Sequence, residues 1–468
     1  MRRAGESLRR KISGIRIDLY HRYDGCKRLE WAGIAVTYMR RSEPDPSYTP
    51  YQRIRTRPTL MQTALADFIR DTPAGREADQ ILRACVHCGF CTATCPTYQL
   101  LGDELDGPRG RIYQIKQVLE GEPANQTVRS HLDRCLSCRS CETTCPSGVN
   151  YHRLLDIGRE QVERQVPRSL SQKILRRLLI ETLSYPKRFT PLLRMGQWMR
   201  PLLPPALRRK VPVARHARRL AAAAPGERRI LMLDGCVQPG LAPEINDALE
   251  VVLGRLGIGV QRTPEAGCCG ALPHHLGDTE RACEMARRNI DAWYPALEAG
   301  AEAVVVTASG CGAHLQDYPK LLADDDPAYA KKALRLASLL RDPLQLLARE
   351  PLEALRLRPR KARLAVHTPC TLQHALNLNG ETERLLLSLG YELCAVNDGH
   401  LCCGSAGTYS ILQPDLANQL RERKLHALRA DHPDLIVSAN IGCLMHLGET
   451  GGIPVRHWLT MVAEDLHD

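Results

Sequence analysis

Cysteine dominates the chemistry that this sequence of 468 residues could perform. Nineteen cysteines are present, and sixteen of them fall into two kinds of repeated pattern. Secreted proteins that depend on many disulfides are usually short chains. The regular spacings in this long chain therefore favour metal ligation in a reducing cytosol.

The first pattern occurs twice and has the spacing of bacterial ferredoxins. It reads Cys85-x2-Cys88-x2-Cys91-x3-Cys95-Pro96 and again Cys135-x2-Cys138-x2-Cys141-x3-Cys145-Pro146. Three such thiolates hold one [4Fe–4S] cluster, and the fourth, on a helix that leaves the loop, reaches the neighbouring cluster. We therefore assign one cluster to Cys85, Cys88, Cys91 and Cys145, and the other to Cys95, Cys135, Cys138 and Cys141. Zinc sites also use C-x2-C pairs, but zinc leaves the third cysteine and the Cys-Pro of each copy unexplained.

The second pattern is an internal duplication. Cys236 is followed 32 residues later by Cys268-Cys269-Gly270, and Cys311 lies 42 residues beyond Cys269. Cys370 is followed 32 residues later by Cys402-Cys403-Gly404, and Cys443 lies 40 residues beyond Cys403. Two such spacings in tandem indicate a repeated domain. Each set of four is a candidate ligand set for a further iron–sulfur site; buried free thiols are the alternative, since cysteine packs as a small hydrophobe.

Each repeat also places a histidine three residues after its last cysteine, at His314 and His446. Imidazole replaces thiolate at Rieske iron sites, where it raises the reduction potential. Ligation is therefore one interpretation of these histidines, beside the commoner one of a packed or solvated side chain. Cys26, Cys283 and Cys394 fit neither pattern and are expected to be free thiols.

Strand-like runs lead into the single cysteines of both repeats, at residues 229–233, 303–307, 364–367 and 435–439. Segments with helical periodicity, such as 244–256 and 414–428, lie between them. Strands that alternate with helices predict parallel sheets, whose ligands gather beyond the carboxyl ends of the strands. We expect the cysteines of each repeat on that rim, with Gly267, Gly270 and Gly404 allowing close backbone approach to a bulky group.

The predicted fold is α/β plus α-helical: a helical bis-[4Fe–4S] ferredoxin-type domain followed by two tandem α/β cysteine-rich repeats with parallel sheets. Residues 1–60 are a basic extension, either disordered or upstream of a true start at Met61. The ferredoxin-type domain spans 61–165 and a basic helical connector 166–225. The first and second repeats span 226–350 and 351–468.

The formal net charge of +12 is concentrated in two places. Residues 1–60 carry +8 of it, and residues 173–219 hold 13 basic side chains against Glu181 alone. A nucleic-acid partner is not expected, because no helix-turn-helix or RNA-binding signature accompanies this charge. Basic residues of the connector alternate with Phe189, Trp198 and other apolar side chains, which suits an anionic membrane surface, a partner-binding surface or a solvated linker.

No run of about 18–20 apolar residues predicts a membrane-spanning helix, and we expect no secretory signal.

Longer strings around these motifs resemble the iron–sulfur subunits of bacterial glycolate oxidase, also called glycolate dehydrogenase. They are ILRACVHCGFC at 81–91, GPRGRI at 107–112, CETTCPSG at 141–148, EAGCCG at 265–270, HLCCGSAGT at 400–408 and ANIGC at 439–443. The ferredoxin and Cys-Cys-Gly motifs are shared more widely, by lactate-utilisation proteins, anaerobic glycerol-3-phosphate dehydrogenase subunits and heterodisulfide reductases. Many domains of that wider group end in Cys-x-x-Cys, whereas both repeats here have Cys-x-x-His.

The resemblance implies a complex in which partner subunits carrying FAD oxidise glycolate to glyoxylate. This chain would pass the electrons to a quinone or another acceptor, from the cytoplasm or from the cytoplasmic face of the inner membrane as a peripheral protein. No G-x-G-x-x-G fingerprint and no acid–base pair is present, so we assign no catalytic residue. The alternatives are a relay for a lactate or glycerol-3-phosphate dehydrogenase, a thiol–disulfide catalyst of the heterodisulfide reductase kind, and a scaffold that its clusters only stabilise.

Overall fold

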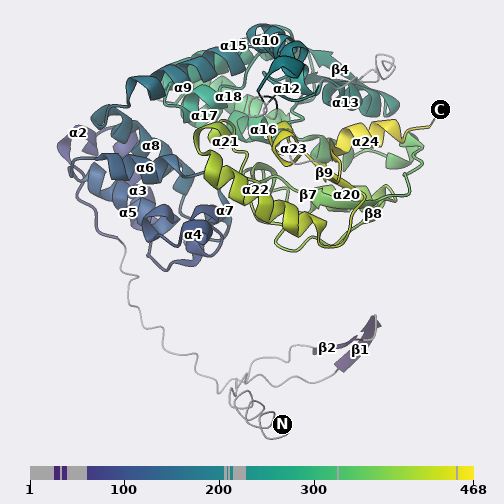
Figure 1. Ribbon diagram of the computed structural model, residues 1–468, viewed down its shortest axis with the longest axis horizontal. Coiled ribbons are helices and arrows are strands. Elements are labelled where there is room, and N and C mark those ends of the chain that lie inside the picture. Colours follow the sequence, from purple (N-terminus) through teal and green to yellow (C-terminus); the bar gives the residue numbers. More distant parts are fainter. Residues whose placement is uncertain are drawn as a thin grey trace, which may run out of the picture. The chain divides into compact units, whose positions relative to one another are not determined.

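The computed structural model describes residues 26–31, 34–39, 61–204, 208, 211–213, 228–323, 326–448 and 452–467 (Figure 1). The chain divides into two compact units, Met1–Thr59 and Leu60–Asp468. In the first unit, β1 (Cys26–Trp31) and β2 (Ile34–Met39) pair antiparallel. The rest of the predicted basic extension lies outside the described residues. All candidate ligands belong to the second unit.

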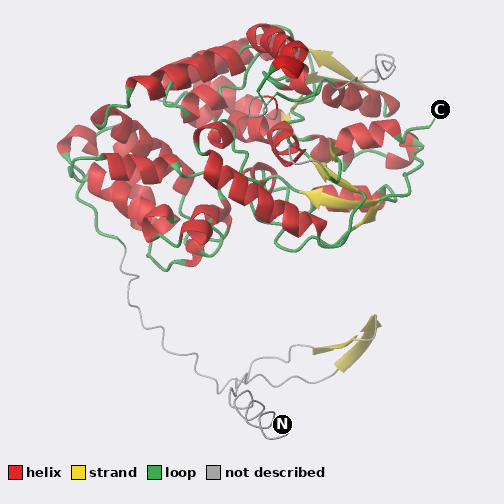
Figure 2. Ribbon diagram, in the orientation of Figure 1, coloured by secondary structure: helices red, strands yellow, loops and turns green. Residues whose placement is uncertain are grey.

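The ferredoxin-type region is helical, as predicted (Figure 2). Its helices are α2 (Asp67–Arg70), α3 (Pro73–Ala84), α4 (Pro96–Leu101), α5 (Pro108–Leu119), α6 (Gln126–Asp133), α7 (Ser140–Thr143) and α8 (Tyr151–Gln165), with the 3-10 turns η1 (Phe90–Thr92) and η2 (Glu104–Asp106). Helix α3 begins where Thr72 accepts a hydrogen bond from the Gly75 amide and Pro73 fills the first turn. Fully buried leucine and isoleucine side chains of α3, α5 and α8 form one core, which includes Leu82, Ile115 and Leu154.

Two helices and a 3-10 turn form the described part of the connector: α9 (Leu170–Leu183), α10 (Pro186–Met199) and η3 (Arg200–Leu202). Helix α10 packs against α9 and against α12 (Gln238–Leu241) of the first repeat. The packing on α12 is close, because a Cβ on Gly240 would lie 3.3 Å from the Phe189 ring. The connector therefore covers the segment that directly follows Cys236.

The two repeats contain equivalent four-stranded parallel sheets. The first has the order β4-β3-β5-β6, from β3 (Arg228–Met232), β4 (Ile258–Arg262), β5 (Val304–Val305) and β6 (Leu340–Arg341). The second has the order β8-β7-β9-β10, from β7 (Arg363–His367), β8 (Glu392–Leu393), β9 (Leu435–Ser438) and β10 (Val455–His457). Because each strand has a counterpart at the same place in the other sheet, the duplication inferred from the cysteine spacing extends to the topology.

The helices between the strands complete this pattern. In the first repeat they are α12, α13 (Glu244–Arg255), α14 (Ala271–His275), α15 (Thr279–Glu298), α16 (Ser309–Gln316), α17 (Tyr318–Leu321), α18 (Pro327–Leu339) and α19 (Pro343–Leu347), followed by η4 (Leu352–Leu355). In the second they are η5 (Thr371–Ala375), α20 (Glu381–Ser388), α21 (Tyr409–Leu412), α22 (Pro414–Arg429), α23 (Ile441–Gly448) and α24 (Trp458–Glu464). The predicted helices at 244–256 and 414–428 correspond to α13 and α22.

The repeats are interlocked rather than merely consecutive. Helix α24, which ends the second repeat, packs on α13 of the first (Figure 1). Helix α19, at the end of the first repeat, packs on α20 of the second. Leu249, Leu344, Leu386 and Trp458, one from each of these helices, belong to a single buried cluster. The two cysteine-rich repeats therefore share one hydrophobic core. No described helix has both the length and the apolar composition needed to cross a bilayer.

Candidate metal centres

The two ferredoxin-type loops follow the same unusual backbone path. His87 and Gly89 flank Cys88 with φ of 54° and 85°, and Ser137 and Arg139 flank Cys138 with φ of 52° and 61°. Non-glycine residues adopt this left-handed conformation at a cost of order 1–3 kcal/mol, and such residues cluster at functional sites. The conformation curls each loop so that its three cysteines face one cavity.

The first cavity is lined by all four cysteines predicted for one cluster: Cys85, Cys88, Cys91 and Cys145. Burial, followed by the neighbouring thiols, raises the pKa of Cys91 to about 11. The Cys91 thiol therefore resists ionisation, and the positive charge of a metal would favour its thiolate. The donor set therefore fits an iron–sulfur cluster.

The second cavity is lined by the other predicted set: Cys95, Cys135, Cys138 and Cys141. Cys95 reaches it from the N-cap position of α4, as the spacing rule suggests. Cys145 differs from that expectation, because it lies in a turn between α7 and α8 and not on a helix. Pro108, Cys141 and Tyr151 line both cavities, so the two candidate centres share a wall.

A buried cation borders the second cavity. The Arg111 guanidinium is 1% exposed, and its Nε donates to the His131 carbonyl at 2.8 Å. Its terminal nitrogens donate to Thr97 Oγ1 at 3.1 and 3.2 Å and to Asp106 Oδ1 at 3.3 Å. Asp106 also pairs with Arg134 at 2.8 Å, so the local charge balance is positive. That balance favours an anionic group in the cavity.

In the first repeat, the structure brings Cys236, Cys268, Cys269 and Cys311 together. The thiol of Cys268 contacts those of Cys236 and Cys269, and Cys269 contacts Cys311. As predicted, each of these cysteines follows the carboxyl end of a strand, namely β3, β4 or β5. The amide of Gly270 donates to Cys268 Sγ at 3.4 Å, which is the type of contact that would stabilise a thiolate.

The second repeat assembles Cys370, Cys402, Cys403 and Cys443 in the same way. Cys370 Sγ lies 3.9 Å from Cys402 Sγ, and Cys403 contacts both Cys402 and Cys443. The Gly404 amide donates to Cys402 Sγ at 3.4 Å, and Asn440 Nδ2 donates to Cys443 Sγ at the same distance. Both predicted four-cysteine sets are thus present as compact clusters of sulfur atoms.

The glycines after the paired cysteines lie close to the backbone of neighbouring helices. Gly270 and Gly404 have φ of 88° and 86°, a conformation that L side chains rarely adopt. A Cβ at Gly404 would lie 2.5 Å from the Ala417 carbonyl oxygen, and one at Gly270 would lie 3.2 Å from that of Ala282. These glycines therefore allow close approach to the backbone of α22 and α15.

The two histidines predicted as candidate ligands occupy different environments. His314 is buried, and its Nε2 has no hydrogen-bond partner in the part of the chain that the structure describes. Burial lowers its pKa to about 3. His446 Nε2 instead lies 3.2 Å from the Ala417 carbonyl oxygen on α22. Equivalent positions in the sequence motif therefore do not have equivalent surroundings.

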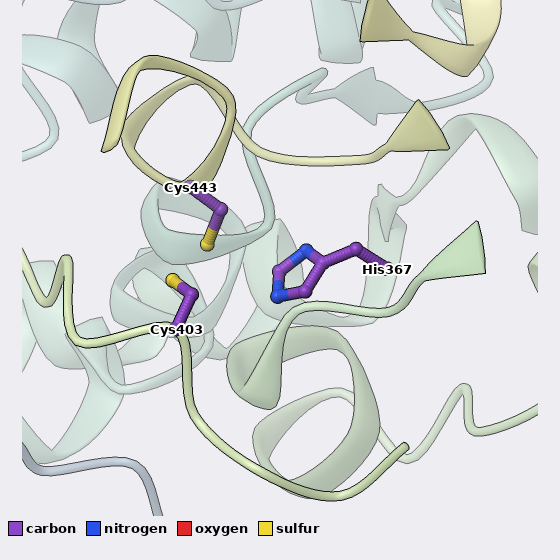
Figure 3. Close-up of side chains that lie close together, drawn as sticks. All are labelled: His367, Cys403 and Cys443. Atoms are coloured by element: carbon purple, nitrogen blue, oxygen red, sulfur yellow. The ribbon is translucent and has the colours of Figure 1, made fainter. Parts of the chain in front are cut away.

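Sequence reasoning missed a third histidine. His367 ends β7, and one of its ring nitrogens lies within 4.8 Å of Cys403 Sγ and Cys443 Sγ (Figure 3). One feature of the sequence could have identified this histidine: His367 lies three residues before Cys370. The first repeat, however, has Leu233 at the corresponding place before Cys236, so comparison of the repeats hides it.

The remaining described cysteines stand apart from the clusters. Cys283 Sγ donates to the Leu321 carbonyl at 3.6 Å, and Cys394 Sγ donates to the Asp431 carbonyl at 3.6 Å. Neither forms a disulfide. The side chain of Cys26 lies outside the described residues.

Comparison with known proteins agrees with this arrangement. The family model of a 4Fe-4S dicluster domain matches residues 81–149, and that of a cysteine-rich domain matches 230–316 and 364–448. The chain is 55% identical over 406 residues to the glycolate oxidase iron-sulfur subunit of Escherichia coli (strain K12), covering 87% of this chain and 99% of that protein. This chain belongs to the family of glycolate oxidase iron–sulfur subunits.

More distant relatives divide between this family and its neighbours. The probable glycolate oxidase iron-sulfur subunit of Bacillus subtilis (strain 168) is 31% identical over 393 residues, covering 78% of this chain and 87% of that protein. Lactate utilization protein A of Shouchella clausii (strain KSM-K16) is 31% identical over 229 residues, but the match covers only 47% of this chain. The resemblance to glycolate oxidase iron–sulfur subunits stated from the sequence is confirmed, and the lactate alternative is the weaker one.

The ferredoxin-type domain of this chain contacts both repeats. Tyr409 donates a hydrogen bond to the Arg134 carbonyl at 3.0 Å, and Thr143 Oγ1 lies 2.8 Å from His374 Nδ1. Arg139 forms an ion pair with Asp317 of the first repeat. The 4Fe–4S dicluster domain is therefore fixed against the cysteine-rich domains by polar contacts on both sides.

Proposed function

We propose that this chain is the electron-transfer subunit of a glycolate-oxidising complex. Flavin-containing partner subunits would convert glycolate to glyoxylate, and this chain would pass the electrons to a quinone or another acceptor. Its eight ferredoxin-type cysteines would hold two [4Fe–4S] clusters in the sets given above, and the eight cysteines of the repeats would hold further iron–sulfur centres. When bound, these groups supply one-electron carriers.

The observation that carries this proposal is that the four cysteine sets follow one another through shared cavity walls and shared apolar clusters. Cys141 lines both ferredoxin-type cavities. Cys138 packs in one apolar cluster with Cys370 and Cys402 of the second repeat. Cys311 of the first repeat packs against two apolar clusters, one containing Cys269 and the other containing Cys403 and Cys443. Electron transfer requires cysteine sets that follow one another in this way, whereas clusters that only stabilise a scaffold do not.

One end of this succession offers a surface for the flavin partner. Cys88 is exposed, and large apolar side chains beside it, including Phe90 at 61% exposure, Val86 and Tyr113, are exposed as well. Contiguous exposed apolar groups mark protein interaction sites. We infer that the flavin subunit docks over the first ferredoxin-type loop.

The other end offers a surface for a membrane. Helices α9 and α10 and the turn after them expose Leu170, Leu178, Met195, Trp198 and Leu202, the last two at 80% each. Lys173, Arg177, Lys187, Arg188 and Arg194 lie on the same helices. Apolar side chains mixed with basic ones fit an anionic lipid surface. Because α10 packs on α12 directly after Cys236, this surface would bring the first repeat close to a membrane quinone, on the cytoplasmic face.

Purification of the complex tests the proposal. Affinity-tagged chain should co-purify with flavoprotein subunits, and the complex should reduce a dye when glycolate is added. A double substitution of Cys88 and Cys138 to serine should abolish dye reduction through this subunit while flavin reduction by glycolate persists. Failure to retain iron in anaerobic wild-type preparations, or full dye reduction by the double variant, would overturn the proposal.

A further inference from the structure

In the second repeat, the ring of His367 faces the sulfur atoms of Cys403 and Cys443 (Figure 3). A ring nitrogen of His367, Cys403 Sγ and Cys443 Sγ lie within 4.8 Å of one another, and all three side chains are buried. We propose that His367 is a ligand of the metal centre in the second repeat, together with Cys370, Cys402, Cys403 and Cys443. The inference rests on the proposed function, in which those cysteines hold an iron–sulfur centre.

Two neighbouring strands fix the orientation of this ring. His367 ends β7 and is paired in register with Ser438, which ends β9. His367 Nδ1 lies 2.9 Å from Ser438 Oγ. Metal-ligating histidines characteristically use one ring nitrogen for such a hydrogen bond and the other for the metal. The bond to Ser438 therefore leaves Nε2 as the nitrogen for the centre.

The histidine of the Cys-x-x-His motif is not placed in this way. His446 lies on α23 three residues after Cys443, and its Nε2 is directed at the Ala417 carbonyl at 3.2 Å. A nitrogen held by a backbone carbonyl is a hydrogen-bond donor and has no lone pair for a metal. His367 therefore takes the role that the motif suggests for His446.

The first repeat has no counterpart of His367. The position three residues before Cys236 is Leu233, which is buried in an apolar cluster with Cys269. A neutral imidazole in place of, or beside, anionic thiolates raises the reduction potential of an iron–sulfur centre. The two repeats would therefore hold centres of different potential, with the higher one in the second repeat.

Electron spin-echo spectroscopy on reduced, full-length protein labelled with ¹⁵N-histidine tests the assignment directly. Wild-type protein should show a strongly coupled histidine nitrogen, which the two all-cysteine ferredoxin-type clusters cannot give. His367→Ala should remove or reduce that coupling and lower the iron content. His367→Cys should restore iron without the nitrogen coupling and with a lower midpoint potential. The matched control His446→Ala should leave coupling, iron and potential unchanged.

The outcomes separate this inference from the proposed function. If wild-type protein contains only the iron of the two ferredoxin-type clusters, the repeats hold no metal centre. The proposed centres of the repeats and the His367 ligand then fail together. Iron in the repeats with identical spectra and potentials in His367→Ala would overturn the ligand assignment alone. A coupling that persists in His367→Ala and disappears in His446→Ala or His314→Ala would also overturn it.

Discussion

Cys138 of the second ferredoxin-type loop and Cys370 of the second repeat pack against the same apolar cluster. Thr143 and His374, which are 231 residues apart, form a hydrogen bond between the same two domains. Cys402, Leu136 and Tyr409 are among the buried residues of that cluster. We expect an electron to cross from one domain to the other where these two cysteine sets approach each other. The structure thus places the second repeat beside the cysteines of the second ferredoxin-type loop.

Substitution of Cys370 by serine should interrupt transfer between the domains. We expect the rate at which the first-repeat centre is reduced through the ferredoxin-type clusters to fall at least tenfold, because the intervening cysteine set is incomplete. Freeze-quench electron paramagnetic resonance after rapid mixing of the complex with glycolate measures this rate. Cys394→Ser is the matched control, since Cys394 is a buried thiol outside the four-cysteine sets. Equal rates in both variants would contradict this order of contact.

A buried lysine should raise the reduction potential of the second-repeat centre. Lys424 is fully buried, and its Nζ donates to the Gly399 carbonyl at 2.8 Å. Burial lowers the pKa of Lys424, and the four cysteines of the second repeat, which lie near it, act in the opposite direction. A nearby cation stabilises the more negative, reduced state. Lys424→Met should therefore lower the midpoint potential by on the order of 60 mV, equivalent to a tenfold change.

Redox titration followed by electron paramagnetic resonance measures that shift. Lys424→Arg keeps the charge and should keep most of the potential. The potentials of the two ferredoxin-type clusters serve as an internal reference, because both variants leave their cysteines intact. A potential that falls equally in the arginine and methionine variants would show that the buried charge is not the cause.

The exposed apolar side chains of the connector should bind anionic membranes. Replacement of Trp198 and Leu202 by serine should reduce flotation with vesicles containing anionic lipid several-fold, because it removes the side chains that would enter the interface. Replacement of Leu334 and Leu387 is the matched control, since these leucines are 62% and 57% exposed on other helices. If wild-type protein binds neutral vesicles as well as anionic ones, or if high salt does not weaken its binding, the connector does not recognise an anionic membrane surface.

The Asp342 carboxyl should make stability depend on pH near neutrality. Asp342 caps α19, where it accepts from the Leu344 amide at 2.9 Å, and burial raises its pKa to about 7. Between about pH 4 and pH 7 the folded chain binds a proton that the unfolded chain has lost. The free energy of unfolding should therefore fall as pH rises through this range, by at most about 1.4 kcal/mol per pH unit from this group.

Asp342→Asn keeps the cap and removes the ionisation. Its thermal midpoint relative to wild type should be higher at pH 8 than at pH 5, because at pH 8 the wild type contains a buried carboxylate. Differential scanning fluorimetry at the two pH values measures this change. An equal offset at both pH values would mean that Asp342 is ionised in the folded protein throughout.

The sequence alone was enough to predict how the cysteines group and in which order the domains follow. A [4Fe–4S] loop needs thiols at fixed short spacings, so Cys85–Cys95 and Cys135–Cys145 could be grouped without coordinates. The parallel repeats were equally predictable, because strands such as 364–367 and helices such as 414–428 differ in their hydrophobic periodicity. Bounds from the structure differ from these predictions by only one to a few residues.

Only the tertiary structure decided which side chains from distant segments meet. Three features depend on how elements pack: the packing of Cys138 and Cys370 on one apolar cluster, the shared core of α13 and α24, and the place of His367 beside Cys403. Such packing leaves no short periodic signal in the sequence. The repeated Cys-x-x-His motif predicted His446 as a candidate ligand, but the fold turns its ring toward a backbone carbonyl. The spacing of residues in the sequence determines which side chains a single loop can contribute to a site. Long-range packing determines the direction in which each of those side chains points.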